Sequence, residues 1–105
     1  MKMIQHQILT IAGAIGLLLF ASTSYAEVDV RARNLASHCA ACHGTNGNNA
    51  GGMPVLAGMD KALFMSAMKD FKSGARPATV MHNHAKGYTE EEFVKLADFF
   101  AAQKR

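Results

Sequence analysis

Cys39-Ala40-Ala41-Cys42-His43 is the segment from which the rest of this chain is best interpreted. On a helix, residues i, i+3 and i+4 share one face, with Cβ atoms about 5–6 Å apart. One flat group can therefore be bound from the same side by Cys39, Cys42 and His43. Two thiols three residues apart, followed directly by an imidazole, form the attachment pattern of a c-type haem. The sulfurs would bond the vinyl edge of the porphyrin, and the imidazole would reach its iron.

Three other interpretations of the two cysteines are open. A structural disulfide is one, but a ring this small restrains almost none of the chain. A thioredoxin-like redox pair is another, and it calls for a βαβ context that the sequence lacks. A Cys2His2 zinc site would recruit His82 and His84, although zinc-finger histidines are usually spaced by three to five residues. Haem attachment is the prediction that the pentapeptide favours.

The N-terminus has the pattern of an export signal. Lys2 supplies the positive end, residues 8–20 form an apolar run, and small residues before Ala26 offer a cleavage site. A retained membrane anchor is the alternative, but spanning a bilayer takes about 20 apolar residues and this run has 13. We therefore expect residues 1–26 to be a signal peptide that is removed. Because covalent haem attachment of this type occurs outside the bacterial cytoplasm, we expect the mature protein in the periplasm.

Cleavage after Ala26 leaves 79 residues, the size of one small domain. The mature chain has 10 Lys and Arg against 8 Asp and Glu, so its net charge is only +2. It contains no basic run and no basic patch interleaved with aromatic residues, which argues against nucleic acid as a partner. Nothing in this part indicates insertion into a membrane. A covalently held porphyrin would add apolar surface to a core that is otherwise small.

The hydrophobic pattern of the mature chain is helical throughout. It predicts helices over residues 28–41, over residues 60–73 between an Asp60 cap and Gly74, and from a capping box at Thr89 and Glu92 onward. Residues 76–87 are expected to be irregular. No segment alternates as a strand does. In the second helix the buried stripe is expected at Phe64, Ala67, Met68 and Phe71, with Lys61, Lys69, Asp70 and Lys72 facing water.

Residues 44–58 differ sharply in composition from the helices around them. Five glycines, three asparagines and one proline fall within 15 residues. Such a density predicts a loop with several positive-φ positions and close approaches of the backbone. The apolar segment 53–57 distinguishes this loop from a flexible linker, and we expect it to pack against the haem face.

Together these features resemble a class I cytochrome c over nearly the whole of residues 27–105, which implies an all-α, single-haem fold. The pattern is most similar to the cytochrome subunits of flavocytochrome c sulfide dehydrogenase, and proteins of the cytochrome c4 and c553 type share much of it. The segments that carry this resemblance are residues 39–47, 54–58, 71–76, 79–81 and 85–88. The resemblance implies one covalently bound haem c and an FAD-containing sulfide dehydrogenase flavoprotein, or another redox protein, as partner.

The sixth iron ligand of such a carrier is usually a methionine sulfur. Met81 stands at the Thr-x-Met position of the resembling family, in a segment expected to be irregular and free to aim its sulfur at iron. His82 and His84 are the alternatives, because a second imidazole would also complete the coordination and would lower the reduction potential. The remaining mature methionines are expected to fill gaps in the core, or to flank the Pro54 loop.

Two further residues are candidates for contact with the haem or its ligand. The second ring N–H of a ligating histidine usually donates to a carbonyl, and in the resembling family that carbonyl belongs to the proline of the Pro-x-Leu segment, here Pro54. Arg76 is a candidate partner for a haem propionate, with a plain surface position as the alternative. The overall expectation is one-electron transfer rather than enzymatic activity, either as a flavoprotein's haem subunit or as a free carrier of a respiratory or photosynthetic chain.

Overall fold

The computed structural model describes residues 29–49 and 51–105, and in these ranges the regular structure is entirely helical. The predicted all-α class is therefore confirmed. The elements in chain order are α2 (Val30–Ser37), α3 (Ala40–His43), a 3₁₀ turn η1 (Thr45–Gly47), α4 (Lys61–Ser73), α5 (Met81–Lys86) and α6 (Glu90–Ala101). The expected signal peptide, residues 1–26, lies outside the described residues and stays a prediction.

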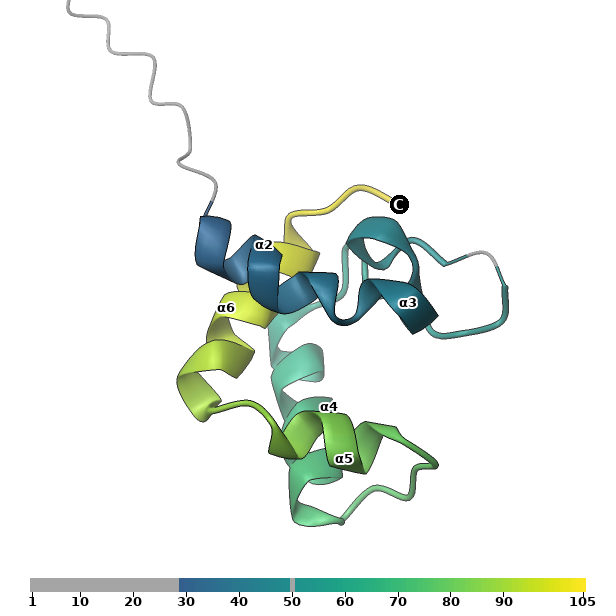
Figure 1. The fold of residues 1–105 in the computed structure, drawn as a ribbon, viewed down its shortest axis with the longest axis vertical. Coiled ribbons are helices and arrows are strands. Elements are labelled where there is room, and N and C mark those ends of the chain that lie inside the picture. The colour runs from purple at the N-terminus through teal and green to yellow at the C-terminus, as the bar shows by residue number, and fades with distance from the viewer. Residues whose placement is uncertain (1–28, 50) are drawn as a thin grey trace, which may run out of the picture.

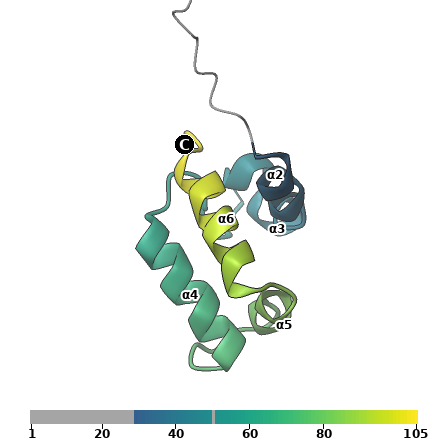
Figure 2. The same ribbon diagram turned by 90° about the vertical axis from the view of Figure 1, so that its left-hand side faces the viewer.

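Helix α6 is the centre of the packing. It lies along α4 on one side and against α2 on the other, while α5 packs against the C-terminal end of α4 (Figures 1 and 2). Its apolar stripe, Phe93, Leu96, Ala97 and Phe100, is fully buried, as the sequence predicts. From α4, Phe64 and Met68 complete the core, and the Phe64 and Phe100 ring centroids lie 5.7 Å apart.

Side-chain caps fix the starts of the two long helices at the predicted residues, and α4 ends at the predicted glycine. Asp60 accepts a hydrogen bond from the backbone N–H of Leu63 at 3.0 Å, and Gly74 ends α4 in the left-handed conformation with φ +84°. Thr89 accepts from the N–H of Glu92 at 3.1 Å, and the Glu92 carboxylate accepts from the Thr89 N–H at 3.0 Å. These contacts satisfy N–H groups that a helix start otherwise leaves without partners.

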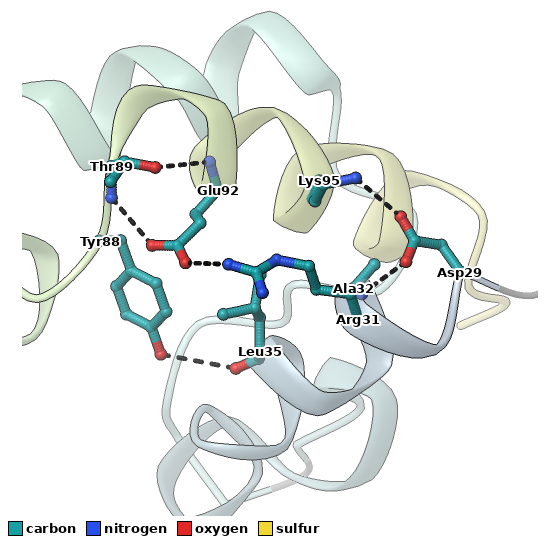
Figure 3. A network of polar contacts seen from close by, with 8 residues as sticks. All are labelled: Asp29, Arg31, Ala32, Leu35, Tyr88, Thr89, Glu92 and Lys95. Carbon is teal, nitrogen blue, oxygen red and sulfur yellow. Dashed lines mark hydrogen bonds and ion pairs between the residues drawn. The ribbon is translucent and has the colours of Figure 1, made fainter.

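A polar network joins α2 to α6 (Figure 3). Asp29 caps α2 through the N–H of Ala32 at 3.0 Å and meets Lys95 at 3.1 Å, while Arg31 pairs with Glu92 at 2.9 Å. The hydrogen bond from Ala32, followed by that from Lys95, holds the pKa of Asp29 below its ordinary value. A carboxylate with a lowered pKa stabilises the fold above the usual carboxyl range, and that contribution is lost as the pH falls through the folded-state pKa.

The prediction of one continuous first helix was wrong. Helix α2 ends at Ser37, and α3 begins only at Ala40. The ladder breaks because the N–H of Cys39 bonds the carbonyl of Ala36, three residues back, at 3.0 Å. The Leu35 carbonyl that this N–H would meet in an α-helix instead lies 3.5 Å from the hydroxyl of Tyr88. The break gives the attachment segment a short helix of its own, with a direction different from α2 (Figure 1).

The prediction that residues 76–87 are irregular was also wrong, because they contain α5. Its start has no side-chain cap, and it has only six residues, so the sequence carries no strong helical signal there. Met81 and Ala85 stand one turn apart on the same face, and Ala85 is completely buried. Packing of this face against α4 and the core, rather than local propensity, forms the helix.

The prediction that Lys72 faces water was wrong as well. Its side chain is half-buried, and its ammonium donates to the backbone carbonyl of Tyr88. The same ammonium lies 5.4 Å from the centroid of the Phe93 ring. The long aliphatic stem of a lysine can cover apolar surface while its charged end finds a polar partner. Lys61 and Lys69 do face water, paired with Asp98 and Glu90.

Gly47 makes the closest backbone approach in the glycine-rich loop. Its φ is +78°, and a Cβ added there would lie 2.8 Å from the Cβ of Leu56 and 3.0 Å from the Phe100 ring. We expect Gly47→Ala to lose about 1–2 kcal/mol of unfolding free energy through the left-handed backbone, and about 1–3 kcal/mol more through overpacking.

Gly74→Ala is the matched control in chemical denaturation. Its φ of +84° is similar, but no atom lies within 4 Å of the added Cβ. It should lose only the backbone contribution, and equal losses in the two variants would contradict the close approach at Gly47.

Candidate haem attachment site

The two thiols and the imidazole of the pentapeptide lie on one helical turn, as predicted. Cys39 has helical φ and ψ of −83° and −21°, and its carbonyl accepts the N–H of His43 at 2.9 Å. The Cys39 side chain is half-buried and Cys42 is exposed, and neither is in a disulfide. The turn therefore presents both sulfurs, at i and i+3, for bonds to one planar group while His43 at i+4 points inward.

His43 has a polar atom that none of the described residues satisfies. The residue is 7% exposed, and its Nδ1 lies 2.7 Å from the carbonyl oxygen of Pro54, so Nδ1 carries the hydrogen and donates. The Nε2 atom is buried without a hydrogen-bond partner. A buried polar atom without a partner is costly and calls for an explanation. An unprotonated Nε2 beside two thiols has the chemistry needed to ligate haem iron, so the residues fit the group.

The loop that carries Pro54 is packed, as the sequence predicts. Gly47 uses its carbonyl to accept the N–H groups of Leu56 at 2.9 Å and Ala57 at 3.3 Å. Leu56 and Ala57 are buried. The Asn49 side chain donates to the carbonyl of Cys42 at 2.9 Å, which ties the loop back to α3. Backbone contacts at short range thus hold the Pro54 carbonyl in front of the imidazole.

The rival interpretations of the cysteines lose support from this geometry. Burial raises the pKa of the Cys39 thiol, whereas redox-active Cys-x-x-Cys pairs depend on a lowered pKa. The zinc alternative requires at least three suitable side chains close together. Residues 29–49 and 51–105 contain no group of three or more His, Cys, Asp or Glu side chains arranged to hold a metal ion.

Met81 is the first residue of α5, half-buried and packed against the core. In both views α5 lies on the same side of the domain as α3, farther along the length of α6 (Figures 1 and 2). Of the other mature methionines, Met68 is buried in the core, and Met59 and Met65 are half-buried against it. Met53 is exposed. Met68 and Met65 therefore have the packing role predicted for them.

The helical form of α5 separates Met81 from its histidine neighbours. Successive side chains on a helix point about 100° apart, so Met81 and His82 cannot face the same atom. His82 lines a hollow of about 280 Å³ together with Lys86 and Arg76. His84 lines a second hollow with His38, between α2 and α5. The helical backbone of residues 81–86 therefore restricts the directions in which the Met81 side chain can point, whereas the sequence predicted an irregular segment.

Arg76 lies outside the core. Its guanidinium carbon is 5.0 Å from the centroid of the Phe71 ring, and its backbone N–H donates to the carbonyl of Asp70 at 3.2 Å. No ion pair or hydrogen bond from its guanidinium to the described residues is present. The role predicted for it at a propionate stays a prediction.

Comparison with known proteins agrees with this geometry. The family model of cytochrome c matches residues 30–104. The chain belongs to the cytochrome c family. It is a small class I cytochrome c domain whose Cys39 and Cys42 imply one covalent haem c, and as a domain it is an electron carrier rather than an enzyme. None of the helices in the described ranges is long and apolar enough to cross a membrane.

Three relatives place this cytochrome among bacterial carriers. The cytochrome subunit of sulfide dehydrogenase from Chlorobaculum tepidum is 44% identical over 67% of the chain and 64% of its own length. Cytochrome c4 from Pseudomonas aeruginosa is 34% identical over 66% of the chain and 35% of its own length. Cytochrome c-553 from Helicobacter pylori is 36% identical over 87% of the chain and 94% of its own length. The chain thus spans less than two thirds of the first two relatives but nearly all of the third.

Proposed function

We propose that this cytochrome is a periplasmic, monohaem electron carrier that accepts single electrons from a sulfide-oxidising flavoprotein. The observation that carries the haem chemistry is the buried Nε2 of His43, which has no hydrogen-bond partner among residues 29–49 and 51–105 and lies on the same turn as two free thiols. Support for the donor is the 44% identity to a cytochrome subunit of sulfide dehydrogenase. The periplasmic location rests on the predicted signal peptide, residues 1–26.

Each site residue has a distinct role in this proposal. Cys39 and Cys42 would hold the porphyrin by thioether bonds, and the Nε2 of His43 and the sulfur of Met81 would ligate its iron. The Pro54 carbonyl orients the His43 ring and increases its basicity as a ligand. The haem supplies a one-electron couple when bound. Methionine ligation and burial favour the ferrous state and raise the reduction potential.

A free, diffusing carrier is the second candidate. The observation that favours it is the alignment with cytochrome c-553 from Helicobacter pylori, which covers 94% of that protein and 87% of this chain. A cytochrome of similar length therefore aligns with this chain over nearly its whole length. The haem chemistry is common to both candidates, and they differ only in whether the cytochrome remains bound to a flavoprotein.

Native purification distinguishes the two candidates. We expect the covalent-haem band from a periplasmic extract of the native host to elute in gel filtration together with a flavin-containing polypeptide. The complex should reduce its haem when sulfide is added, whereas the cytochrome separated from it in high salt should not. Elution of the haem protein alone, at the size of a small monomer and without flavin fluorescence, would exclude the subunit and favour the free carrier.

A further inference from the structure

We propose that Asn48 and Arg105 are positioning residues that set the strength of the hydrogen bond between His43 and Pro54, and through it the reduction potential. The proposal rests on the ligation of iron by His43 proposed above. Neither residue is hydrogen-bonded to His43: their side chains donate to the carbonyls of Lys104 and Ala57. Each instead links the segment that follows α6 to the loops on either side of the His43–Pro54 contact.

Two side-chain hydrogen bonds form this link. The Arg105 Nε donates to the carbonyl of Ala57 at 3.0 Å, three residues after Pro54. Asn48 lies five residues after His43, and its side chain donates to the carbonyl of Lys104 at 2.6 Å. Figure 1 shows the segment after α6 turning back toward η1 and its loop. Residues 104 and 105 therefore join the turn that follows His43 to the loop that carries Pro54.

The same loop is fixed on its other edges by the backbone. Gly58 donates its N–H to the carbonyl of Phe100, the last buried residue of α6, at 2.8 Å. Gly47 accepts from Leu56 and Ala57, as described above. A Cβ on Gly58 would lie 3.5–3.7 Å from Gln103 and Arg105, so the segment after α6 is in contact with the loop. With the residues that the structure describes, Pro54 makes one hydrogen bond, in which its carbonyl accepts from the Nδ1–H of His43.

The chemical consequence follows from the direction of the His43 hydrogen bond. A strong bond from Nδ1–H to a carbonyl makes the imidazole a better donor to iron, which stabilises the ferric state and lowers the potential. Loosening the Pro54 loop weakens that bond and raises the potential. Loss of a positive charge near the haem has the opposite sign, because it favours the ferric state and lowers the potential. The two effects on Arg105 are therefore distinguishable.

The test measures four variants of the haem-loaded protein: Asn48→Ala, Arg105→Ala, Arg105→Lys and, as control, Lys104→Ala. Lys104 contributes its backbone carbonyl to the link, so its side chain reports charge alone. At a fixed ambient potential we expect Asn48→Ala and Arg105→Ala to lower the ratio of oxidised to reduced protein about threefold. This is a smaller change than the roughly 10- to 100-fold loss of metal affinity or activity that is typical when a direct partner of a metal ligand is removed. Arg105→Lys should restore part of the ratio, and Lys104→Ala should not lower it.

The second readout is the His43 Nδ1–H resonance of the ferrous protein. Its exchange with solvent should accelerate in Asn48→Ala and Arg105→Ala only. Unchanged potential and exchange in both variants, with a loss of stability alone, would show that the link is merely structural and would overturn the proposal. An increase in the ratio for both Arg105→Ala and Lys104→Ala would assign the effect to charge instead. Failure of His43 to ligate iron would appear separately, in the spectrum of the unsubstituted protein.

Discussion

Met81→Ala is expected to convert a closed, six-coordinate haem protein into one that binds carbon monoxide readily. Met81 is the half-buried first residue of α5, and in the proposed ligation the loss of its sulfur would leave His43 as the one protein ligand of the iron. The sulfur-to-iron charge-transfer absorption should disappear, and the reduction potential should fall because methionine ligation favours the ferrous state. Optical spectra with and without carbon monoxide, together with a redox titration, measure all three effects.

Met65→Ala is the control for loss of packing. Met65 is also half-buried and packed against the core, but it lies on α4. This variant should lose stability and keep its charge-transfer band and its resistance to carbon monoxide. Met81→His should restore six-coordination at a lower potential than the parent protein. If the parent itself binds carbon monoxide avidly, the filled sixth position is wrong and a haem enzyme or gas sensor becomes the better account.

Replacing both thiols, Cys39→Ala with Cys42→Ala, is expected to abolish covalent haem and much of the stability. In the part of the chain that the structure describes, the large side chains that are completely buried are Phe93, Leu96 and Phe100. A single core in a domain of this size rarely supplies more than about 3–5 kcal/mol. Without thiols to bond the porphyrin, the double variant should show no covalent-haem band in a denaturing gel. The chain also loses the apolar surface of the porphyrin from its core. Its thermal transition should be broad, without the cooperativity of the parent.

Ala41→Ser is the matched control, since Ala41 is exposed between the two cysteines. It should keep full haem content and a cooperative transition. Each single cysteine variant retains one sulfur and should hold a reduced amount of haem by one thioether bond. A double variant that still melts like the parent would mean that the porphyrin contributes little to the fold.

The parts of this fold that local chemistry dictates could be read from the sequence. The caps at Asp60 and Thr89 and the stripe of α6 come from residue types at fixed spacings, and the structure places them as expected. The break after Ser37 and the helix at Met81 could not be read in this way. Both depend on partners distant in sequence, namely Tyr88 at the Leu35 carbonyl and the packing of Ala85 against α4 and the core.

The candidate site likewise has features that could be predicted from the sequence and features that could not. The spacing of Cys39, Cys42 and His43 is local, so the pentapeptide alone predicts their common turn. The partner of His43 came only through the resemblance to a family, because a backbone carbonyl has no signature in a sequence. The contacts of Asn48 and Arg105 were missed for the same reason: each side chain donates to a main-chain oxygen 48 or more residues away.

Covalent attachment of one haem to this chain can be measured by intact-mass analysis of the protein, expressed with its N-terminal segment in a bacterium that matures c-type cytochromes. We expect one species in the periplasmic fraction, with the mass of residues 27–105 plus one haem that stays attached after denaturation. Bare polypeptide from a host that matures other c-type cytochromes normally, or haem that separates from the chain on denaturation, would contradict covalent attachment.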